Sequence, residues 1–275
     1  MLIDCAGKPL DLSQPQVMGL LNVTPDSFSD GGRFLEPERA VARAQEMADE
    51  GAALIDVGGE STRPGAEAVP VAEELARVIP VIEALAGRLE VPVSIDTMKP
   101  EVMRAAVAAG AGLINDVNAL RAPGALDAAI ELGVPVCLMH MQGEPRSMQQ
   151  NPVYTDVVAE VKAFLAERIG VCEAAGLPRE RLIADPGFGF GKTLEHNLQL
   201  MRGLHELNDL AVPLLVGVSR KSMIGAVVDV PAAERVYGGV ALAALAVWQG
   251  AAIIRTHDVR ATVQAVRMTQ AVKNA

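Results

Sequence analysis

Polar side chains that could bind and activate a small molecule follow a series of short apolar runs along the chain. In chain order, these side chains are Asn22, Asp56, Asp96, Asn115, Asp116, His140, Asp185, Ser219, Arg220, Lys221, Arg255 and His257. A single polar residue after a strand commonly marks only the start of a loop. Because all eight runs end in this way, we expect the polar side chains to line one shared active site.

Two of the carboxylates, Asp96 and Asp185, follow strands of small apolar residues. Asp96 also fits the N-cap of a helix, since Thr97 and Pro100 come shortly after it. Asp185 precedes Pro-Gly-Phe-Gly-Phe-Gly, so it is not expected to cap a helix. A carboxylate can accept two parallel N–H groups, and the amide of Asn115 can both donate and accept. These side chains therefore suit the edge of an amidine-like or guanine-like ring.

A second group of polar residues comes from opposite ends of the chain. Asn22 ends the first apolar run, whereas Arg255 and His257 end the last. The first and last strands are neighbours in a closed barrel. A guanidinium, an imidazole and an amide suit an anion such as phosphate or diphosphate. The alternative for His257 is an ordinary histidine in a surface loop.

The glycine-rich segment GFGFGKT, residues 187–193, superficially resembles a nucleotide-binding P-loop. The spacing argues against that interpretation, because the first glycine that a P-loop requires would fall on Pro186. A mobile or tightly turned active-site loop is expected instead. Phe28, Phe188 and Phe190 lie in loops rich in Gly, Ser or Pro. Core packing is the usual fate of phenylalanine, and contact with an aromatic substrate is the alternative.

The apolar runs are continuous rather than alternating, which predicts strands buried on both faces. The runs are VMGLLNV, ALIDVGG, PVSIDT, GLINDV, PVCLMH, RLIADPG, PLLVGVS and AIIRTH. Amphipathic segments predict helices at 37–50, 71–88, 100–109, 126–132, 156–175, 196–207, 232–249 and 260–272. This order predicts a (β/α)₈ barrel, formed as one domain by residues 1–275, with the first fifteen residues covering one end. A doubly wound sheet is the alternative, but no Gly-rich dinucleotide motif follows the first run.

The composition limits the partners. Half of the 275 residues are hydrophobic, and the net charge of −10 argues against nucleic acid or an anionic membrane as partner. Cys5, Cys137 and Cys172 are far apart without a C-x-x-C motif, which predicts reduced thiols rather than a zinc site or disulfides. The N-terminus does not resemble a signal peptide, and the apolar segment 238–254 is too short for a clean membrane span. A cytoplasmic location is expected.

Eight motifs of the chain are similar to those of the dihydropteroate synthase family, which binds pterins. They are LNVTPDSFSDGG, IDVGGESTRPGA, SIDT, INDV, LMHMQG, DPGFGFGK, GVSRKSMIG and IRTHDV. The motifs occur in the order that the family has and extend over residues 17–259. The resemblance implies a (β/α)₈ barrel that condenses (7,8-dihydropterin-6-yl)methyl diphosphate with 4-aminobenzoate. The products would be 7,8-dihydropteroate and diphosphate, in tetrahydrofolate synthesis.

The resemblance also implies a role for individual residues. Asp96, Asn115, Asp185 and Lys221 would bind the pterin edge, and Arg255 would stack on the pterin ring and contact phosphate. The residues implied to hold the pterin diphosphate also include Asn22, Thr62 and His257, with Asn22 contacting Mg²⁺. Those implied to shape the 4-aminobenzoate pocket are Phe28, Thr62, Arg63, Pro64, Phe190, Lys221 and Ser222. Asp96, Lys221, Arg255 and His257 would form the catalytic set, Asp56 would support the site from below, and His140 has no implied role.

The chemistry of this reaction makes a dissociative substitution our hypothesis. An aryl amine is a poor nucleophile, whereas early loss of diphosphate leaves a cation that is delocalised into the pterin ring. Mg²⁺, Arg255 and His257 would stabilise the leaving group, and nearby carboxylates the cation. No covalent enzyme intermediate is required.

Three alternatives stay open at this point. A pterin-binding methyltransferase would share the barrel, but it would not need two aryl-amine loops or an Arg–His diphosphate clamp. A Schiff-base aldolase would need its lysine in an apolar pocket, whereas Lys221 lies in a polar S-R-K-S run. A non-catalytic relative is disfavoured by the intact motif residues.

The resemblance further implies a homodimer, for which the apolar helix at 232–249 is the candidate interface. Sulfonamides are inhibitors of the family.

Overall fold

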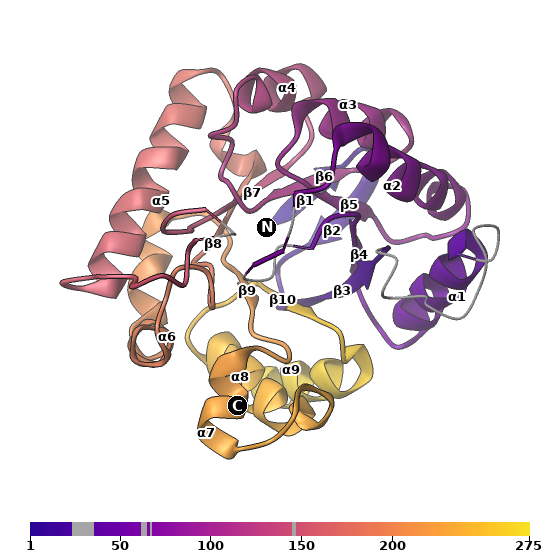
Figure 1. Ribbon diagram of the computed structural model, residues 1–275. Coiled ribbons are helices and arrows are strands. Elements are labelled where there is room, and N and C mark those ends of the chain that lie inside the picture. The colour runs from indigo at the N-terminus through magenta and orange to yellow at the C-terminus, as the bar shows by residue number, and fades with distance from the viewer. Residues whose placement is uncertain (24–35, 62–64, 67, 145–146) are drawn as a thin grey trace.

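The computed structural model describes residues 1–23, 36–61, 65–66, 68–144 and 147–275, in which eight parallel strands form a barrel (Figure 1). The strands are β3 (Gln16–Asn22), β4 (Leu54–Gly58), β5 (Val93–Asp96), β6 (Leu113–Asp116), β7 (Val136–Met139), β8 (Leu182–Asp185), β9 (Leu215–Gly217) and β10 (Ile253–Thr256). Their order is β8-β7-β6-β5-β4-β3-β10-β9. A parallel bridge between Ala184 and Leu214 closes the ring between β8 and β9. The predicted barrel is therefore confirmed.

Helices surround the ring of strands, as the amphipathic segments predicted (Figure 1). They are α1 (Glu36–Asp49), α2 (Val71–Ala86), α3 (Pro100–Ala108), α4 (Ala125–Leu132), α5 (Val157–Ala174), α6 (Leu194–Arg202), α8 (Val236–Trp248) and α9 (Val259–Lys273). A further short helix, α7 (Ser222–Val228), lies between β9 and α8. Its seven residues are too few for a periodic pattern to predict.

Two of the predicted helices differ in their ends. The segment expected as one helix at 196–207 is α6 followed by the 3₁₀ helix Leu204–Leu210, with Gly203 between them. The segment expected from residue 232 begins with the 3₁₀ turn Ala232–Glu234, and α8 starts only at Val236. Both differences fall at helix ends, where tighter 3₁₀ turns are common.

Alternate residues of each strand face the barrel interior or the surrounding helices. In β4, Leu54 packs inside the barrel, whereas Ile55 and Val57 belong to the larger cluster that the helices cover. Asp56 faces inward again and is completely buried. Burial of both faces explains why these strands read as continuous apolar runs, and why a carboxylate among them requires a partner inside the barrel.

The amino-terminal hairpin covers one end of the barrel, as expected for the first fifteen residues. It consists of β1 (Leu2–Cys5) and β2 (Lys8–Asp11). The hairpin contributes Ile3, Cys5 and Leu10 to a cluster inside the barrel. They pack there with Met18 and Leu54, the inward-facing residues nearest the amino ends of β3 and β4. The hairpin therefore covers the amino ends of the strands, and the carboxyl ends are available for a site.

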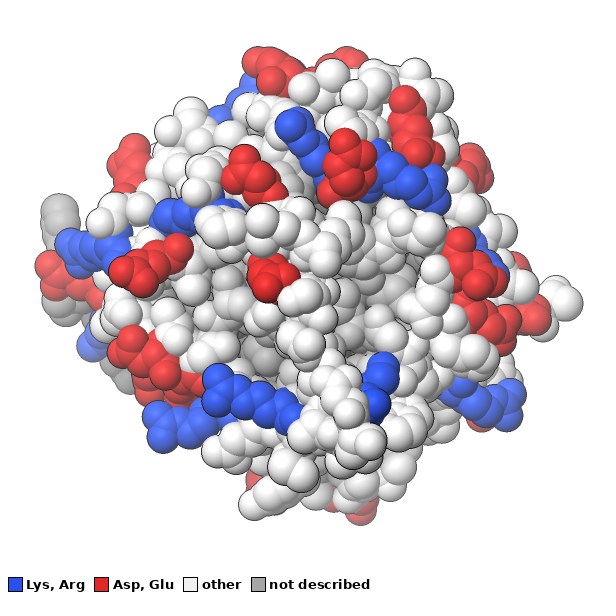
Figure 2. All heavy atoms as spheres, turned by 180° about the vertical axis from the view of Figure 1, so that it is seen from behind, with Lys and Arg blue, Asp and Glu red and all other residues white. Residues whose placement is uncertain are grey.

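Charged residues are interspersed on the face shown in Figure 2, where no basic patch gathers. This distribution agrees with the acidic net charge of −10. Within the described residues, no helix has both the length and the apolar character needed to cross a membrane.

Candidate functional site

A polar network fills the carboxyl end of the barrel, and Arg255 of β10 is its centre. Its Nε donates to Asp56 Oδ2 at 2.6 Å, and its Nη2 donates to Asp96 Oδ2 at 2.6 Å. Asn115 of β6 donates from Nδ2 to the same Asp56 oxygen at 3.0 Å. Three consecutive strands, β4, β5 and β6, and the distant strand β10 thus contribute to one network.

The electrostatics of this network depend on burial. Burial raises the pKa of Asp96 to about 7, although the positive charge of Arg255 partly opposes the increase. Burial lowers the pKa of Arg255, but the nearby carboxylates more than offset this effect. The pKa of Arg255 therefore lies above its usual value. Arg255 therefore stays charged, whereas Asp96 can take up a proton near neutral pH.

Three buried side-chain oxygen atoms of Asp56, Asp96 and the neighbouring Ser94 have no hydrogen-bond partner within the described residues. They are Asp56 Oδ1, Ser94 Oγ and Asp96 Oδ1. Unpaired buried acceptors are costly, and they are commonly satisfied by a ligand or an ordered water. The side chain of Asp96 therefore has hydrogen-bonding capacity left for a bound molecule. Asp96 does not cap α3, because that helix begins after Lys99 and has no side-chain cap.

Asp185 and Lys221 form a second part of the site, at the ends of β8 and β9. Asp185 Oδ1 accepts a hydrogen bond from Gly187 N at 2.7 Å. Burial raises the pKa of Asp185, while Lys221 lowers it. Burial likewise lowers the pKa of Lys221 to about 8, partly offset by Asp185. The two groups supply a carboxylate and an ammonium to the rim of the barrel, which is formed by the carboxyl ends of its strands.

The glycine-rich loop 186–191 is tightly turned and lies against Lys221. Lys221 Nζ donates to Phe188 O and lies 4.8 Å from the centre of the Phe190 ring. Phe188 itself is completely buried in the core, whereas Phe190 is half-buried. A Cβ at Gly187 would lie 1.9 Å from His140 O, so this close approach requires glycine.

Sequence reasoning missed the importance of Lys192 and left His140 without a role. Lys192 is 3% exposed, and its Nζ lies 2.9 Å from His140 Nδ1. The same Nζ donates to Gly187 O at 2.8 Å and to Phe190 O at 3.1 Å. Burial and the Lys192 charge lower the pKa of His140 to about 2, so its ring is neutral. Two sequence features included Lys192, namely the rejected P-loop pattern and the family motif DPGFGFGK, but neither gave it a role.

A third part of the site lies where β3 adjoins β10. The register of the two parallel strands places Asn22 and His257 on the same rim. His257 Nδ1 lies 3.0 Å from Ser219 Oγ, and the same hydroxyl accepts from His257 N at 3.1 Å. His257 therefore has a fixed ring orientation, unlike an ordinary histidine in a surface loop.

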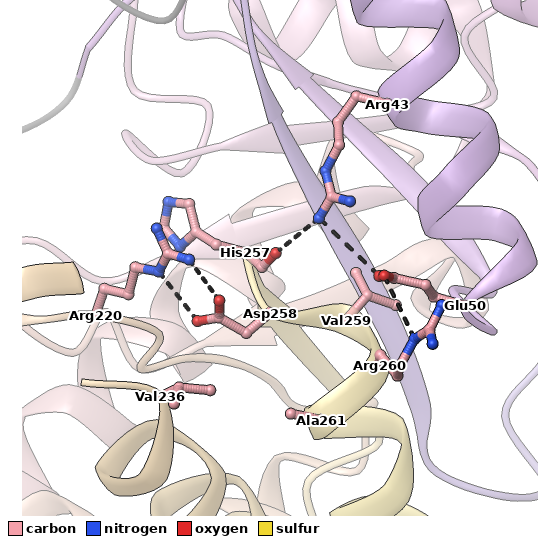
Figure 3. A pocket seen from close by; sticks show the side chains of 9 residues that line it. All are labelled: Arg43, Glu50, Arg220, Val236, His257, Asp258, Val259, Arg260 and Ala261. Carbon is pink, nitrogen blue, oxygen red and sulfur yellow. Dashed lines mark hydrogen bonds and ion pairs between the residues drawn. The ribbon is translucent and has the colours of Figure 1, made fainter. Parts of the chain in front are cut away.

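His257 also lines a pocket between the rim and the outer helices, shown in Figure 3. Arg220 forms a bidentate ion pair with Asp258 across this pocket. Arg43 donates to His257 O at 3.3 Å, and Glu50 lies within 4.0 Å of Arg43. The arginines of the pocket already have acidic partners, so the pocket is a support for the rim rather than a second site.

One expected rim residue is placed differently. Asp116 was grouped with the rim residues, but it points away from the barrel interior. Its two oxygens accept from Asn118 N at 2.7 Å and from Leu120 N at 2.8 Å, which stabilises the turn after β6. The expectation was wrong because alternate strand residues face opposite sides, and Asn115 takes the inward position.

Several expected 4-aminobenzoate residues lie outside the described residues. They are Phe28, Thr62, Arg63 and Pro64. Among the described residues of this group, Ser222 begins α7 directly after Lys221, and Phe190 lies beside Lys221. Lys221 thus lies near both Phe190 and the carboxylate of Asp185.

A largely buried ion cluster that sequence reasoning missed consists of Glu60, Glu74 and Lys99. Lys99 Nζ is 2.7 Å from Glu60 Oε2 and also pairs with Glu74, which is completely buried. The second oxygen of Glu60 accepts from Val69 N at 2.8 Å. These contacts join Glu60 and Val69 to Lys99, directly before α3, and Lys99 in turn to Glu74 of α2.

No cluster of three or more His, Cys, Asp or Glu that could hold a metal occurs within the described residues. Magnesium does not require one, because it commonly uses one or two protein oxygens together with substrate phosphates and water. The side-chain oxygen of Asn22 is a suitable hard ligand. It lies 3.8 Å from the position that a Cβ on Gly58 would occupy, close to Asp96.

Comparison with known proteins gives consistent matches over the whole chain. The model of a family described as pterin binding enzyme matches residues 18–257. The dihydropteroate synthase of Escherichia coli (strain K12) is 56% identical over 275 residues, which cover 100% of this chain and 98% of that protein.

Two solved structures extend the comparison to bound molecules. Xanthomonas albilineans dihydropteroate synthase with 4-aminobenzoic acid has a TM-score of 0.95 at 57% identity, and the match covers 100% of this chain and 98% of that one. The Xanthomonas albilineans enzyme in complex with 7,8-dihydropteroate has a TM-score of 0.91 at 54% identity, and the match covers 100% of both chains.

Proposed function

The chain belongs to the pterin-binding enzyme family, and we propose that it condenses (7,8-dihydropterin-6-yl)methyl diphosphate with 4-aminobenzoate. The products are 7,8-dihydropteroate and diphosphate, so the chain is a transferase of a pterinylmethyl group in folate synthesis. The observation that carries this proposal is the grouping of two complementary sets of side chains on one rim, which suit a flat heterocycle and an anion.

The first set suits the edge of the pterin. Asp96, Asn115 and Asp185 lie at the carboxyl ends of β5, β6 and β8, and Lys221 follows β9. These strands belong to one arc of the barrel. Asp96 keeps one buried oxygen without a partner among the described residues, available for pterin N–H groups. Paired N–H donors on a flat ring match carboxylate geometry.

The second set suits the diphosphate. Asn22 and His257 lie at the ends of the adjacent strands β3 and β10. Arg255 lies between the two sets, since its guanidinium contacts Asp56 and Asp96. Its remaining N–H groups and its flat face can therefore serve both the phosphate and the pterin ring.

The arrangement supports a dissociative substitution. The carbon–oxygen bond to diphosphate breaks first, and the departing oxygen takes the bonding electrons. Arg255 and His257 stabilise the leaving anion, and the carboxylates of Asp96 and Asp185 stabilise the pterin cation. The amine of 4-aminobenzoate then attacks the carbon, and the nitrogen loses a proton to the released diphosphate or to water. A covalent adduct on Lys221 that accumulates during turnover would contradict this order.

We also propose that Mg²⁺ takes part, held by Asn22 and by the substrate diphosphate. The ion would neutralise negative charge on the leaving group. One amide oxygen is consistent with magnesium, which retains waters and phosphate oxygens as its other ligands.

The exposed apolar face of α8 and α9 supports a homodimer as a further proposal. Tyr237 is 85% exposed, and Leu245 and Trp248 lie on the same side of α8. Met268 and Val272 of the adjoining helix α9 are exposed as well. Exposed large apolar side chains on two adjoining helices are typical of an interface between subunits.

A cytoplasmic location is likewise a proposal. Its support comes from Cys5, Cys137 and Cys172, which are buried free thiols. Thiols persist in reducing compartments.

Release of diphosphate tests the function directly. We expect release only when both substrates are present, together with formation of 7,8-dihydropteroate by mass spectrometry. A methyltransferase or a non-catalytic pterin-binding protein would release none. Asp185→Asn is expected to lower kcat/KM by about a hundredfold or more, as for a charge that interacts with the transition state. Asp209→Asn, which changes an exposed carboxylate paired with Lys162, is the matched control and should retain the wild-type rate.

A further inference from the structure

Lys192 is a buried lysine to which the proposed reaction gives no role. Its Nζ has three partners: His140 Nδ1 at 2.9 Å, Gly187 O at 2.8 Å and Phe190 O at 3.1 Å. Burial of such a group is costly unless every polar atom finds a partner. Three partners satisfy the amino group completely, so Lys192 has no hydrogen-bonding capacity left for a substrate.

The two carbonyls that Lys192 holds flank the part of the loop that touches Lys221. Lys221 Nζ donates to Phe188 O and lies 4.8 Å from the centre of the Phe190 ring. The stem of Lys221 also lies against Gly189, where an added Cβ would be 3.2 Å from its Cδ. The path of the loop between residues 187 and 190 therefore determines where the Lys221 ammonium can lie.

We propose that Lys192 and His140 together are positioning residues, which fix the loop 187–190 and through it the ammonium of Lys221. The catalytic consequence rests on the proposed function, because it assumes that Lys221 contacts the substrates. His140 orients Lys192 from β7, and its neutral ring packs edge-on against Phe164 with ring centres 4.9 Å apart. The pair thus connects the core under α5 to the rim.

Other contacts hold the same loop at Gly189 and, just beyond it, at Gly191. Gln149 Nε2 donates to Gly189 O at 2.6 Å, and Tyr154 Oη donates to Gly191 O at 2.8 Å. Asn197 Oδ1 accepts from Gly189 N at 2.7 Å. Loss of the Lys192 contacts should therefore release the carbonyls of Gly187 and Phe190 without detaching the whole loop.

A double-mutant cycle between Lys192 and Lys221 tests the proposal. We expect Lys192→Met to lower kcat/KM by about tenfold, with the fall divided between kcat and KM as in Lys221→Met. When Lys192→Met is added to Lys221→Met, kcat/KM should fall by less than about twofold below that of Lys221→Met alone. Multiplication of the two single losses would overturn the proposal.

The division between kcat and KM separates positioning from a structural role. If Lys192 only supported folding, Lys192→Met would lower the active fraction, so the apparent kcat would fall and KM would not change. That result would also overturn the proposal. The matched control is Lys162→Met, which changes a half-buried lysine paired with Asp209, and it should leave both parameters within about twofold of the wild type.

A second variant covers the case in which Lys192→Met does not fold. His140→Phe keeps an aromatic ring beside Phe164 but removes Nδ1, and it should show the same coupling to Lys221→Met with a smaller loss. Independent effects of His140 and Lys221 would contradict the proposal. A wild-type chain without synthase activity would refute the proposed function instead, so the two failures are distinguishable.

Discussion

Arg255 and Asp56 are joined across the barrel by a contact of 2.6 Å between Nε and Oδ2, although their strands are not neighbours in the sheet. The same Asp56 oxygen accepts from Asn115 Nδ2. Asp56 is completely buried, so its carboxylate holds two residues of the candidate site without being accessible itself. It is therefore a support for Arg255 and Asn115, in agreement with the role expected from the family resemblance.

Replacing Asp56 should destabilise the fold as well as the site. Among the described residues, Asp56→Asn leaves the Arg255 guanidinium with Asp96 as its one hydrogen-bonded carboxylate partner. Loss of one partner of a buried pair costs about 3–5 kcal/mol. Urea denaturation measures the change in the free energy of unfolding. Glu131→Gln, which removes a surface pair with Arg104, is the control and should cost less than about 1 kcal/mol. Equal losses in the two variants would show that the buried pair is not important.

The ionisation of Lys221 should govern activity on the alkaline side. Its pKa is lowered to about 8, chiefly by burial, so the ammonium is lost as the pH rises through that value. We expect kcat/KM to fall above about pH 8, because this parameter reports the ionisation of the free enzyme. In Lys221→Arg, the fall should disappear up to about pH 10, since a guanidinium stays charged. An unchanged profile in this variant would assign the fall to another group.

The lowered pKa of Lys221 also affects stability, which should change with pH in the direction opposite to activity. The unfolded chain has a lysine pKa near 10.5, so between about pH 8 and 10.5 it binds more protons than the folded chain. The contribution of Lys221 to the free energy of unfolding therefore increases with pH over this window. Thermal denaturation of the wild type and Lys221→Met over the same range measures the difference.

The barrel was predictable because every strand left a local signal, namely a continuous apolar run with a polar end. The partners of these polar residues were not predictable from the sequence. They depend on closure of the ring and on whether each side chain faces the barrel interior or the surrounding helices. Asp56 and Asp116 both follow apolar residues, yet one faces the interior and the other stabilises a turn outside. Lys192 meets His140 only because the loop after β8 folds back over β7, and neither residue has a local pattern that indicates it.

Glycine at position 187 should be essential for the loop after β8. A Cβ there would lie 1.9 Å from His140 O, and the backbone has a φ of +67°, which favours glycine. Gly187→Ala is expected to lower the free energy of unfolding by about 2–4 kcal/mol and to abolish most of the activity. Gly170→Ala in α5 has open space around its Cβ and should be stabilising by up to about 1 kcal/mol. Similar behaviour of the two variants would contradict the crowding at position 187.

Removal of divalent metal should slow the proposed reaction. We expect diphosphate release to fall after treatment with a chelator and to recover with added Mg²⁺, since the ion neutralises the leaving group. Asn22→Leu should raise the Mg²⁺ concentration for half-maximal rate by about tenfold, as expected when a ligand is lost. Asn274→Leu, near the carboxyl terminus, is the control. A rate that does not respond to chelation would contradict the magnesium proposal.

The apolar face of α8 and α9 should determine the oligomeric state. Trp248 is 55% exposed on this face, and a charge introduced there would be buried without a partner in a dimer. Sedimentation at micromolar concentration is expected to give a dimer for the wild type and a monomer for Trp248→Glu. Val153→Glu, at an apolar residue that is 65% exposed elsewhere, should remain dimeric. Since the rim residues lie within one barrel, the monomeric variant should still bind the pterin substrate, and a monomeric wild type would refute the interface.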